Sequence, residues 1–233
     1  MKRLQVDRRN FNAYKETVNK MFQMFPRNTE VEPPSRDRCR TCAVVGNSVN
    51  LKRSHYGPLI DFQDFVIRMN RGRIKGYEAD VGTRTTHHVM YPGSAMHLDN
   101  TTHLVLFAFK ILDLDWAMKS LNTGISYKER ALKANMDLVM VLNPAFMRYV
   151  HEVWLKKKGK YSSTGFMALV LALHMCDEVH VFGYGADRQG RWSHYWERMK
   201  RGKLKTGVHH GDVEYALINE LDQNKRLTFY RGG

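Results

Sequence analysis

Two histidine–carboxylate pairs near the C-terminal end of the chain have the residue types that acid–base chemistry needs. His209 is followed five positions later by Glu214, and His194 is followed three positions later by Glu197. A histidine exchanges protons near neutral pH, so it can take a proton from a hydroxyl group or hold a departing phosphate. A carboxylate beside it can orient the ring. Such pairs are common by chance, so the chemistry depends on the other segments that position them.

Two asparagines follow apolar segments that read as buried strands. Asn47 comes directly after residues 43–46, and Asn70 directly after residues 65–69. An asparagine amide donates and accepts hydrogen bonds, so it can bind a phosphate or a ribose. Gly46 lets a ligand approach the backbone. A purely structural turn explains the same residues equally well, and both interpretations stay open at this point.

A possible anion site lies at the start of a predicted helix. Ser163, Thr164 and Gly165 open this helix, whose first amides and dipole attract negative charge. An ordinary N-cap accounts for Ser163 as well. Gly183 follows another predicted strand but lacks the later glycine of a dinucleotide-binding fingerprint. We expect Gly183 to make room for a base or a ribose at the end of that strand.

Asp113 and Asp115 form a D-x-D pair, an arrangement that can bridge a divalent metal to a diphosphate. The pair coincides with the start of a helix predicted over residues 115–121. Acidic side chains there cap backbone amides and complement the helix dipole. We therefore predict a capping role and no metal.

The three cysteines, Cys39, Cys42 and Cys176, leave one unpaired in any disulfide scheme. Cys39 and Cys42 have the C-x-x-C spacing of redox and zinc sites. A redox pair usually precedes a helix, whereas a strand follows here. A zinc site needs two further ligands, and Cys176 stands alone in the sequence.

The composition is that of a globular protein with an anionic partner. The chain has 233 residues, of which 43% are hydrophobic, and its formal net charge is +14. Its basic residues are scattered and do not alternate with aromatics, so we do not expect nucleic acid to be the partner. An anionic nucleotide sugar suits a basic cleft equally well. The sequence contains neither an apolar run of eighteen residues nor a signal-peptide pattern, so it reads as soluble.

Short apolar runs alternate with helical stretches, which predicts a single α/β/α sandwich with a largely parallel central sheet. Ligands bind such sheets at the carboxyl ends of the strands, where the strand order reverses. Strands are predicted over residues 43–46, 65–69, 88–91, 104–109, 138–142, 179–182 and 227–230. Helices are predicted over residues 11–25, 115–121, 144–157, 164–175 and 212–221.

Four segments in a fixed order carry a resemblance to a known family. They are residues 42–48 (CAVVGNS), 161–165 (YSSTG), 194–197 (HYWE) and 207–214 (GVHHGDVE). Together they resemble the large, small, third and very small motifs of the animal-type sialyltransferases. The resemblance is closest to the enzymes that cap Galβ1,3GalNAc with sialic acid in α2,3 linkage, and it extends from about residue 5 to about residue 230.

The resemblance implies a role for each histidine. His209 would be the base that deprotonates the acceptor, and His194 would contact the donor phosphate. Glu214 would orient His209 or its loop, and Glu197 would support His194. The basic residues between the two histidines, 198–208, would form a lid over the donor.

The resemblance also implies the binding residues. The contacts to the donor, CMP-N-acetylneuraminate, would be Asn47, Asn70, Ser163, Thr164, Gly165, Gly183 and His194. The contacts to the acceptor sugar would be Gln5, Tyr161 and Tyr127. Val49 replaces the family's usual glycine and Ser162 its usual proline, so the two turns differ from the pattern.

The family pattern accounts for the cysteines through a bridge between Cys42 and Cys176. Cys39 would match a cysteine whose partner, nearer the N-terminus in relatives, is missing here. Disulfide use implies an oxidising compartment. Asn100 begins a glycosylation sequon, Asn100-Thr101-Thr102, which fits passage through the secretory route.

The implied function is inverting, metal-independent transfer of sialic acid from CMP to the 3-hydroxyl of a terminal galactose on a glycoprotein or glycolipid. The fold would be GT-A-like, or Rossmann-like, with residues 1–38 as a helical segment and linker packed on a catalytic domain of residues 39–233. Family members are Golgi proteins with an N-terminal anchor and stem, which this sequence lacks, so we expect a soluble chain in the Golgi lumen or secreted. A nonenzymatic sugar- or nucleotide-binding relative and a basic nucleic-acid-binding α/β protein are the alternatives.

Overall fold

The computed structural model describes residues 9–27, 35, 37–124, 131–187, 190, 192–197 and 209–232. Seven strands form one sheet in which every neighbouring pair is parallel, in the order β5-β4-β3-β2-β1-β6-β7. The strands are β1 Thr41–Val45, β2 Phe65–Met69, β3 His87–Met90, β4 His103–Leu106, β5 Val139–Val141, β6 Glu178–Phe182 and β7 Thr228–Tyr230.

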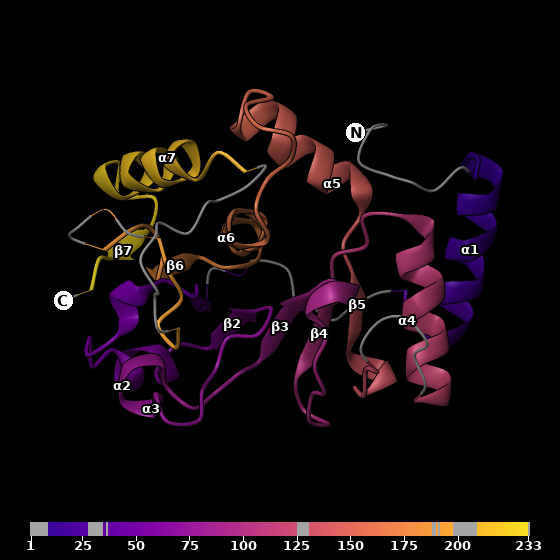
Figure 1. Cartoon of the computed structure of the whole chain (residues 1–233), viewed down its shortest axis with the longest axis horizontal. Coiled ribbons are helices and arrows are strands. Elements are labelled where there is room, and N and C mark those ends of the chain that lie inside the picture. Colours follow the sequence, from indigo (N-terminus) through magenta and orange to yellow (C-terminus); the bar gives the residue numbers. More distant parts are fainter. Residues whose placement is uncertain are drawn as a thin grey trace.

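Helices cover both faces of this sheet, which confirms the predicted α/β/α sandwich (Figure 1). The α-helices are α1 Phe11–Met24, α2 Gly57–Asp61, α3 Glu78–Val81, α4 Ile111–Thr123, α5 Pro144–Tyr149, α6 Thr164–Met175 and α7 Gly211–Gln223. Short 3₁₀ helices span Val49–Leu51, Pro92–Ser94 and Met136–Leu138, and a π-helical turn spans Val150–Trp154.

The two faces of the sheet have separate cores because successive strand residues point to opposite sides. On one face, Val44 and Ile67 pack with α5, α6 and α7. On the other face, Val45 and Val66 pack with α2 and α3. Farther along that second face, Leu106 packs with α4 and α1, so the N-terminal helix shares a core with the sheet. In Figure 1, α1 and α4 therefore lie side by side at one end of the molecule.

All seven predicted strands are present, and the differences concern helices. Helix α4 begins at Ile111, four residues before the predicted start, because Asp113 accepts hydrogen bonds from the backbone N–H groups of Phe109 (2.7 Å) and Lys110 (3.1 Å). The predicted capping role of Asp113 is thus confirmed, although the helix that it caps begins earlier than predicted. Helices α2 and α3 were not predicted because four or five residues are too few for a periodic pattern.

The helix predicted over residues 144–157 ends sooner than expected. The α-helix runs to Tyr149, continues as the π-helical turn and stops at Trp154. Lys156 and Lys157 then take positive φ angles of 49° and 61°, which no continuing helix allows.

The predicted disulfide between Cys42 and Cys176 is confirmed. It joins buried β1 to the C-cap of α6 across 134 residues of sequence. Arg40 ties the same two segments together, since its backbone N–H donates to Asp177 (2.7 Å) and its guanidinium to the carbonyl of Met175 (3.0 Å). Cys39 is an exposed free thiol.

We predict that Cys176→Ser destabilises the protein while Cys39→Ser does not. Closing a loop of this length restricts the unfolded chain, and losing a native disulfide typically costs about 2–5 kcal/mol. Denaturant unfolding without reductant measures the difference. Equal midpoints for the two variants would contradict a stabilising bridge.

Two buried neutral histidines make the fold sensitive to mild acid. Burial, with a smaller effect from the neighbouring His103, lowers the pKa of His87 to about 3. Burial lowers the pKa of His88 to about 4. Because both values lie below the usual 6.5, the unfolded chain binds more protons under pH 6.5, and stability is lost as the pH falls from 6.5 toward 4.

We predict that His87→Phe reduces this acid sensitivity. Phenylalanine preserves the ring packing of His87 against Phe65 (4.5 Å between centroids) but cannot take a proton. Each buried histidine contributes up to about 1.4 kcal/mol per pH unit in this window. Urea unfolding at pH 7 and pH 5 should show a smaller loss for the variant, and an identical loss would show that His87 does not matter.

Candidate functional site

A cavity of about 340 Å³ opens at the carboxyl ends of β1, β2 and β6. The strand order reverses here, because β1 lies between β2 on one side and β6 on the other. Ligands of open parallel sheets bind at such a reversal, as the sequence led us to expect. Eight predicted site residues line the cavity: Asn47, Asn70, Ser163, Gly165, Gly183, His194, His209 and Glu214.

His209 is held by the segment that precedes α6. Its Nδ1 lies 3.0 Å from the carbonyl oxygen of Tyr161, and the Tyr161 ring contacts it edge-on with centroids 4.6 Å apart. A carbonyl oxygen only accepts hydrogen bonds, so Nδ1 must carry the proton. The neutral ring therefore has its lone pair on Nε2, which is the arrangement that a general base requires.

Glu214 is buried in the first turn of α7, and its hydrogen bonds go to Ser163. The backbone N–H of Ser163 donates to one carboxylate oxygen (2.7 Å) and the Ser163 hydroxyl to the other (2.6 Å). The same hydroxyl accepts from the N–H of Phe166 as the N-cap of α6. Burial raises the pKa of the Glu214 carboxyl, although the Ser163 bonds act in the opposite direction. Glu214 therefore joins the first turns of α6 and α7 through Ser163, and its carboxylate also interacts electrostatically with His209.

His194 reaches the cavity because its segment pairs with the loop after β1. His194 forms an isolated bridge with Ser48, and the N–H of Val49 donates to the Ser193 carbonyl (2.8 Å). The His194 ring stacks on Trp196 at 4.6 Å, and its Nδ1 lies 2.8 Å from a carboxylate oxygen of Glu197. Glu197 thus contacts the His194 ring without lining the cavity.

The glycine turns after β1 and β6 are pressed against each other. A Cβ on Gly46 would lie 2.3 Å from the carbonyl oxygen of Gly183, so no side chain fits there. Gly183 itself has a φ of +69°, which favours glycine. Backbone packing, rather than ligand approach alone, therefore explains Gly46. Asn47 follows directly and donates from its amide to the carbonyl of Met69 at the end of β2 (3.2 Å).

Asn70 projects from a strained turn at the end of β2. Its φ is +53°, and its buried side-chain Oδ1 has no hydrogen-bond partner among the described residues. Asn70 lines the cavity, although this oxygen itself is buried. The Asn70 carbonyl accepts a 2.7 Å hydrogen bond from Nε2 of His88, a neutral buried side chain. His88 therefore supports the turn from below, a role that its position beside a strand did not reveal.

Tyr184 is a wall residue that sequence analysis missed. It lines the cavity, and its hydroxyl donates to the carbonyl of Gly165 in the first turn of α6 (2.8 Å). Burial raises its pKa, so the hydroxyl stays protonated and keeps this bond. Tyr184 lies in the sequence Gly183-Tyr184-Gly185, of which only Gly183 was interpreted above. This sequence could have indicated that Tyr184 belongs to the site.

Thr164 and Tyr161 adjoin the cavity without lining it. The D-x-D pair lies elsewhere, on α4, where Asp115 bonds to Arg9 (2.7 Å). Within the described part of the chain, His, Cys, Asp and Glu side chains form no cluster of three that could hold a metal ion. Asn100 is exposed, as a glycosylation site must be.

Three predictions lie outside the described residues: the acceptor contacts Gln5 and Tyr127, and the lid over residues 198–208. None of the helices that the structure describes is both long and apolar enough to cross a bilayer.

Comparisons with known proteins match nearly the whole chain. The profile of glycosyltransferase family 29 (sialyltransferase) matches residues 1–226. The Mus musculus protein named CMP-N-acetylneuraminate-beta-galactosamide-alpha-2,3-sialyltransferase 1 is 42% identical over 99% of this chain and 70% of its own length. The Mus musculus protein of the same name numbered 2 is 44% identical over 93% of this chain. This chain spans only 64% of that second relative.

Solved structures agree with the sequence match. A mammalian sialyltransferase superposes with a TM-score of 0.89 at 40% identity, covering 99% of this chain and 83% of that one. A structure of a mammalian sialyltransferase in complex with Gal-beta-1-3GalNAc-ortho-nitrophenol gives a TM-score of 0.88 at the same identity.

We predict that His88→Phe weakens binding of CMP to the cavity by about tenfold, because the Asn70 carbonyl loses its donor and the strained turn relaxes. Calorimetric titration with CMP measures the affinity. His87→Phe is the matched control, since His87 points to the opposite face of the sheet. Wild-type affinity for CMP in His88→Phe would show that His88 does not contribute to the site.

Proposed function

The chain belongs to glycosyltransferase family 29, the sialyltransferases, and from this premise we propose that it transfers sialic acid from CMP-N-acetylneuraminate to the 3-hydroxyl of a terminal galactose. The acceptor is a Galβ1,3GalNAc-type glycan on a glycoprotein or glycolipid. One observation carries the proposal: His209, held through Nδ1 by the Tyr161 carbonyl, lines a cavity whose other groups suit a nucleotide.

The proton transfer follows from that tautomer. Nε2 of His209 takes the proton of the galactose 3-hydroxyl as its oxygen attacks the anomeric carbon of sialic acid. The bond between that carbon and the CMP phosphate breaks, and its electron pair leaves with CMP. Because attack and departure occur on opposite sides, the configuration at this carbon inverts. Tyr161 lies against His209 and is therefore the residue we assign to the acceptor sugar.

The other groups of the cavity suit the departing CMP. His194, whose Nδ1 faces the Glu197 carboxylate, lines the cavity and offers its other ring nitrogen to the phosphate, where negative charge develops. Asn47 and Asn70 line the cavity and supply amide groups for a ribose hydroxyl or the base. The first turn of α6 presents Gly165 and the positive end of its dipole. CMP carries a single phosphate, so we propose that no metal bridge is needed.

We also propose that the protein works in the lumen of the secretory route, in the Golgi or after secretion. The Cys42–Cys176 disulfide and the exposed sequon at Asn100 support this location, since disulfides and N-glycans are both formed there.

We predict that His209→Asn lowers kcat by at least about a hundredfold while the affinity for CMP stays within the wild-type range, because a general base acts on the acceptor and not on the nucleotide. Transfer from CMP-N-acetylneuraminate to Galβ1,3GalNAc methyl glycoside, with EDTA present throughout, gives the rate.

His210→Asn is the control, because His210 is the exposed neighbour at the N-cap of α7 and asparagine caps helices well. Full turnover in His209→Asn would reject the assigned base. Wild-type protein that binds CMP but transfers nothing would instead favour a nonenzymatic relative.

A further inference from the structure

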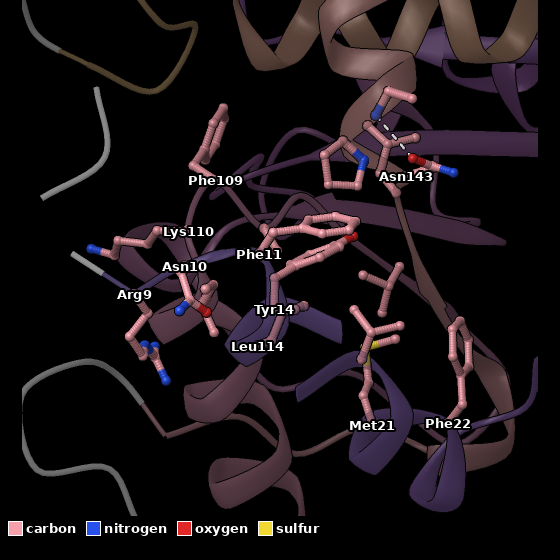
Figure 2. A pocket seen from close by; sticks show the side chains of 17 residues that line it. Arg9, Asn10, Phe11, Tyr14, Met21, Phe22, Phe109, Lys110, Leu114 and Asn143 are labelled. Carbon is pink, nitrogen blue, oxygen red and sulfur yellow. Dashed lines mark hydrogen bonds between the residues drawn. The ribbon is translucent and has the colours of Figure 1, made fainter. Parts of the chain in front are cut away.

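A second and larger cavity, of about 590 Å³, lies between α1, α4 and the start of α5 (Figure 2). Its walls are mainly aromatic and aliphatic, and none of the described residues that line it is acidic. Figure 2 shows the rings of Phe11 and Tyr14 close together near its centre, with Phe109 at one end and Phe22 at the other. The function proposed above does not use this cavity.

The second cavity lies on the same edge of the sheet as the 340 Å³ cavity at the ends of β1, β2 and β6, here called the nucleotide cavity. It is lined by residues that follow β4 and β5, whereas the nucleotide cavity is lined by residues that follow β1, β2 and β6. The strand between them is β3, and Tyr91, which follows it, contacts Phe109 with ring centroids 6.2 Å apart. The two cavities therefore occupy successive stretches of one edge.

A chain of ring contacts joins this cavity to the proposed base. Phe109 lies 5.9 Å from the ring of Tyr161, and Tyr161 lies 4.6 Å from the ring of His209. With the donor in the cavity that His209 lines, as proposed above, an acceptor sugar placed against Tyr161 has Phe109 as its next aromatic neighbour. What is attached to the reducing end of that sugar then meets the second cavity.

We propose that this cavity, here called the aglycone pocket, binds the peptide that carries the acceptor disaccharide. This inference rests on the proposed function. O-glycosylated segments are rich in Ser, Thr and Pro, and proline-rich peptides take the extended polyproline conformation. Grooves lined by aromatic rings bind such peptides. The aglycone pocket supplies Phe11, Tyr14, Phe22 and Phe109 for a proline or another apolar side chain next to the glycosylated residue.

The polar groups of the pocket favour a peptide over a lipid chain. Asn10 and Asn143 each cap a helix through Oδ1, which accepts from the N–H of Ala13 (3.0 Å) and of Ala145 (2.9 Å). The NH₂ group of each amide is thus left to donate to peptide carbonyls. A hydrocarbon chain has no groups that use these donors.

The test compares three acceptors with the same terminal disaccharide: the methyl glycoside, a glycopeptide with proline beside the glycosylated threonine, and a glycolipid. Phe11→Ala removes an exposed wall, and Ala145→Trp narrows the pocket at a second exposed position. Phe62→Ala is the matched control, because this exposed phenylalanine lies outside both cavities. Thermal unfolding of each variant confirms that it is folded.

We expect both pocket variants to lower kcat/KM for the glycopeptide about fivefold to tenfold relative to the methyl glycoside, and Phe62→Ala to leave that ratio unchanged. An unchanged ratio in both pocket variants would overturn the proposal. Selective loss on the glycolipid alone would overturn it as well, because the occupant would then be a lipid. If wild-type protein sialylates none of the acceptors, the proposed function itself fails, an outcome that the methyl glycoside reveals by itself.

Discussion

The carboxylate of Glu214 holds the site together through its two hydrogen bonds to Ser163. These bonds fasten the first turn of α7 to the first turn of α6. His209 lies just before α7 and Tyr161 lies just before α6. The Glu214–Ser163 bonds therefore bring the His209 imidazole against the Tyr161 carbonyl. The carboxylate is buried, and a buried charge persists only when its hydrogen bonds are satisfied. The Nδ1 contact that sets the tautomer of His209 therefore lies between two segments that the Glu214–Ser163 bonds hold together.

The reversal of strand order supplies the second constraint. At this point the turns after β1 and β6 are in backbone contact, since the carbonyl of Gly183 takes the space of a side chain at Gly46. The loop after β1 also pairs with the segment of His194. The His194 segment is thus fixed by backbone interactions at the edge of the sheet. A site built this way loses little conformational entropy when it binds a ligand.

The aglycone pocket extends the same edge toward α1. The helix of the N-terminal segment packs on α4 and forms one wall of the pocket, so a helix that has no part in the proposed chemistry can still select the acceptor. Phe109, in the wall of the pocket, contacts Tyr161, and Tyr161 contacts His209, so two ring contacts separate the pocket from the proposed base. Acceptor choice and reaction then meet at Tyr161, which contacts both Phe109 and His209.

The sequence by itself determined the strands, the sandwich and eight of the residues that line the nucleotide cavity, because apolar periodicity and motif order are local properties. It also indicated the bridge between Cys42 and Cys176 through the family pattern. Only the tertiary structure decided which residues the polar side chains contact. Glu214 proved to bond Ser163, and His88, which read as a packing residue, proved to support Asn70. These pairings join residues 18 to 51 positions apart, and strand register and helix docking, rather than local spacing, bring them within hydrogen-bond distance.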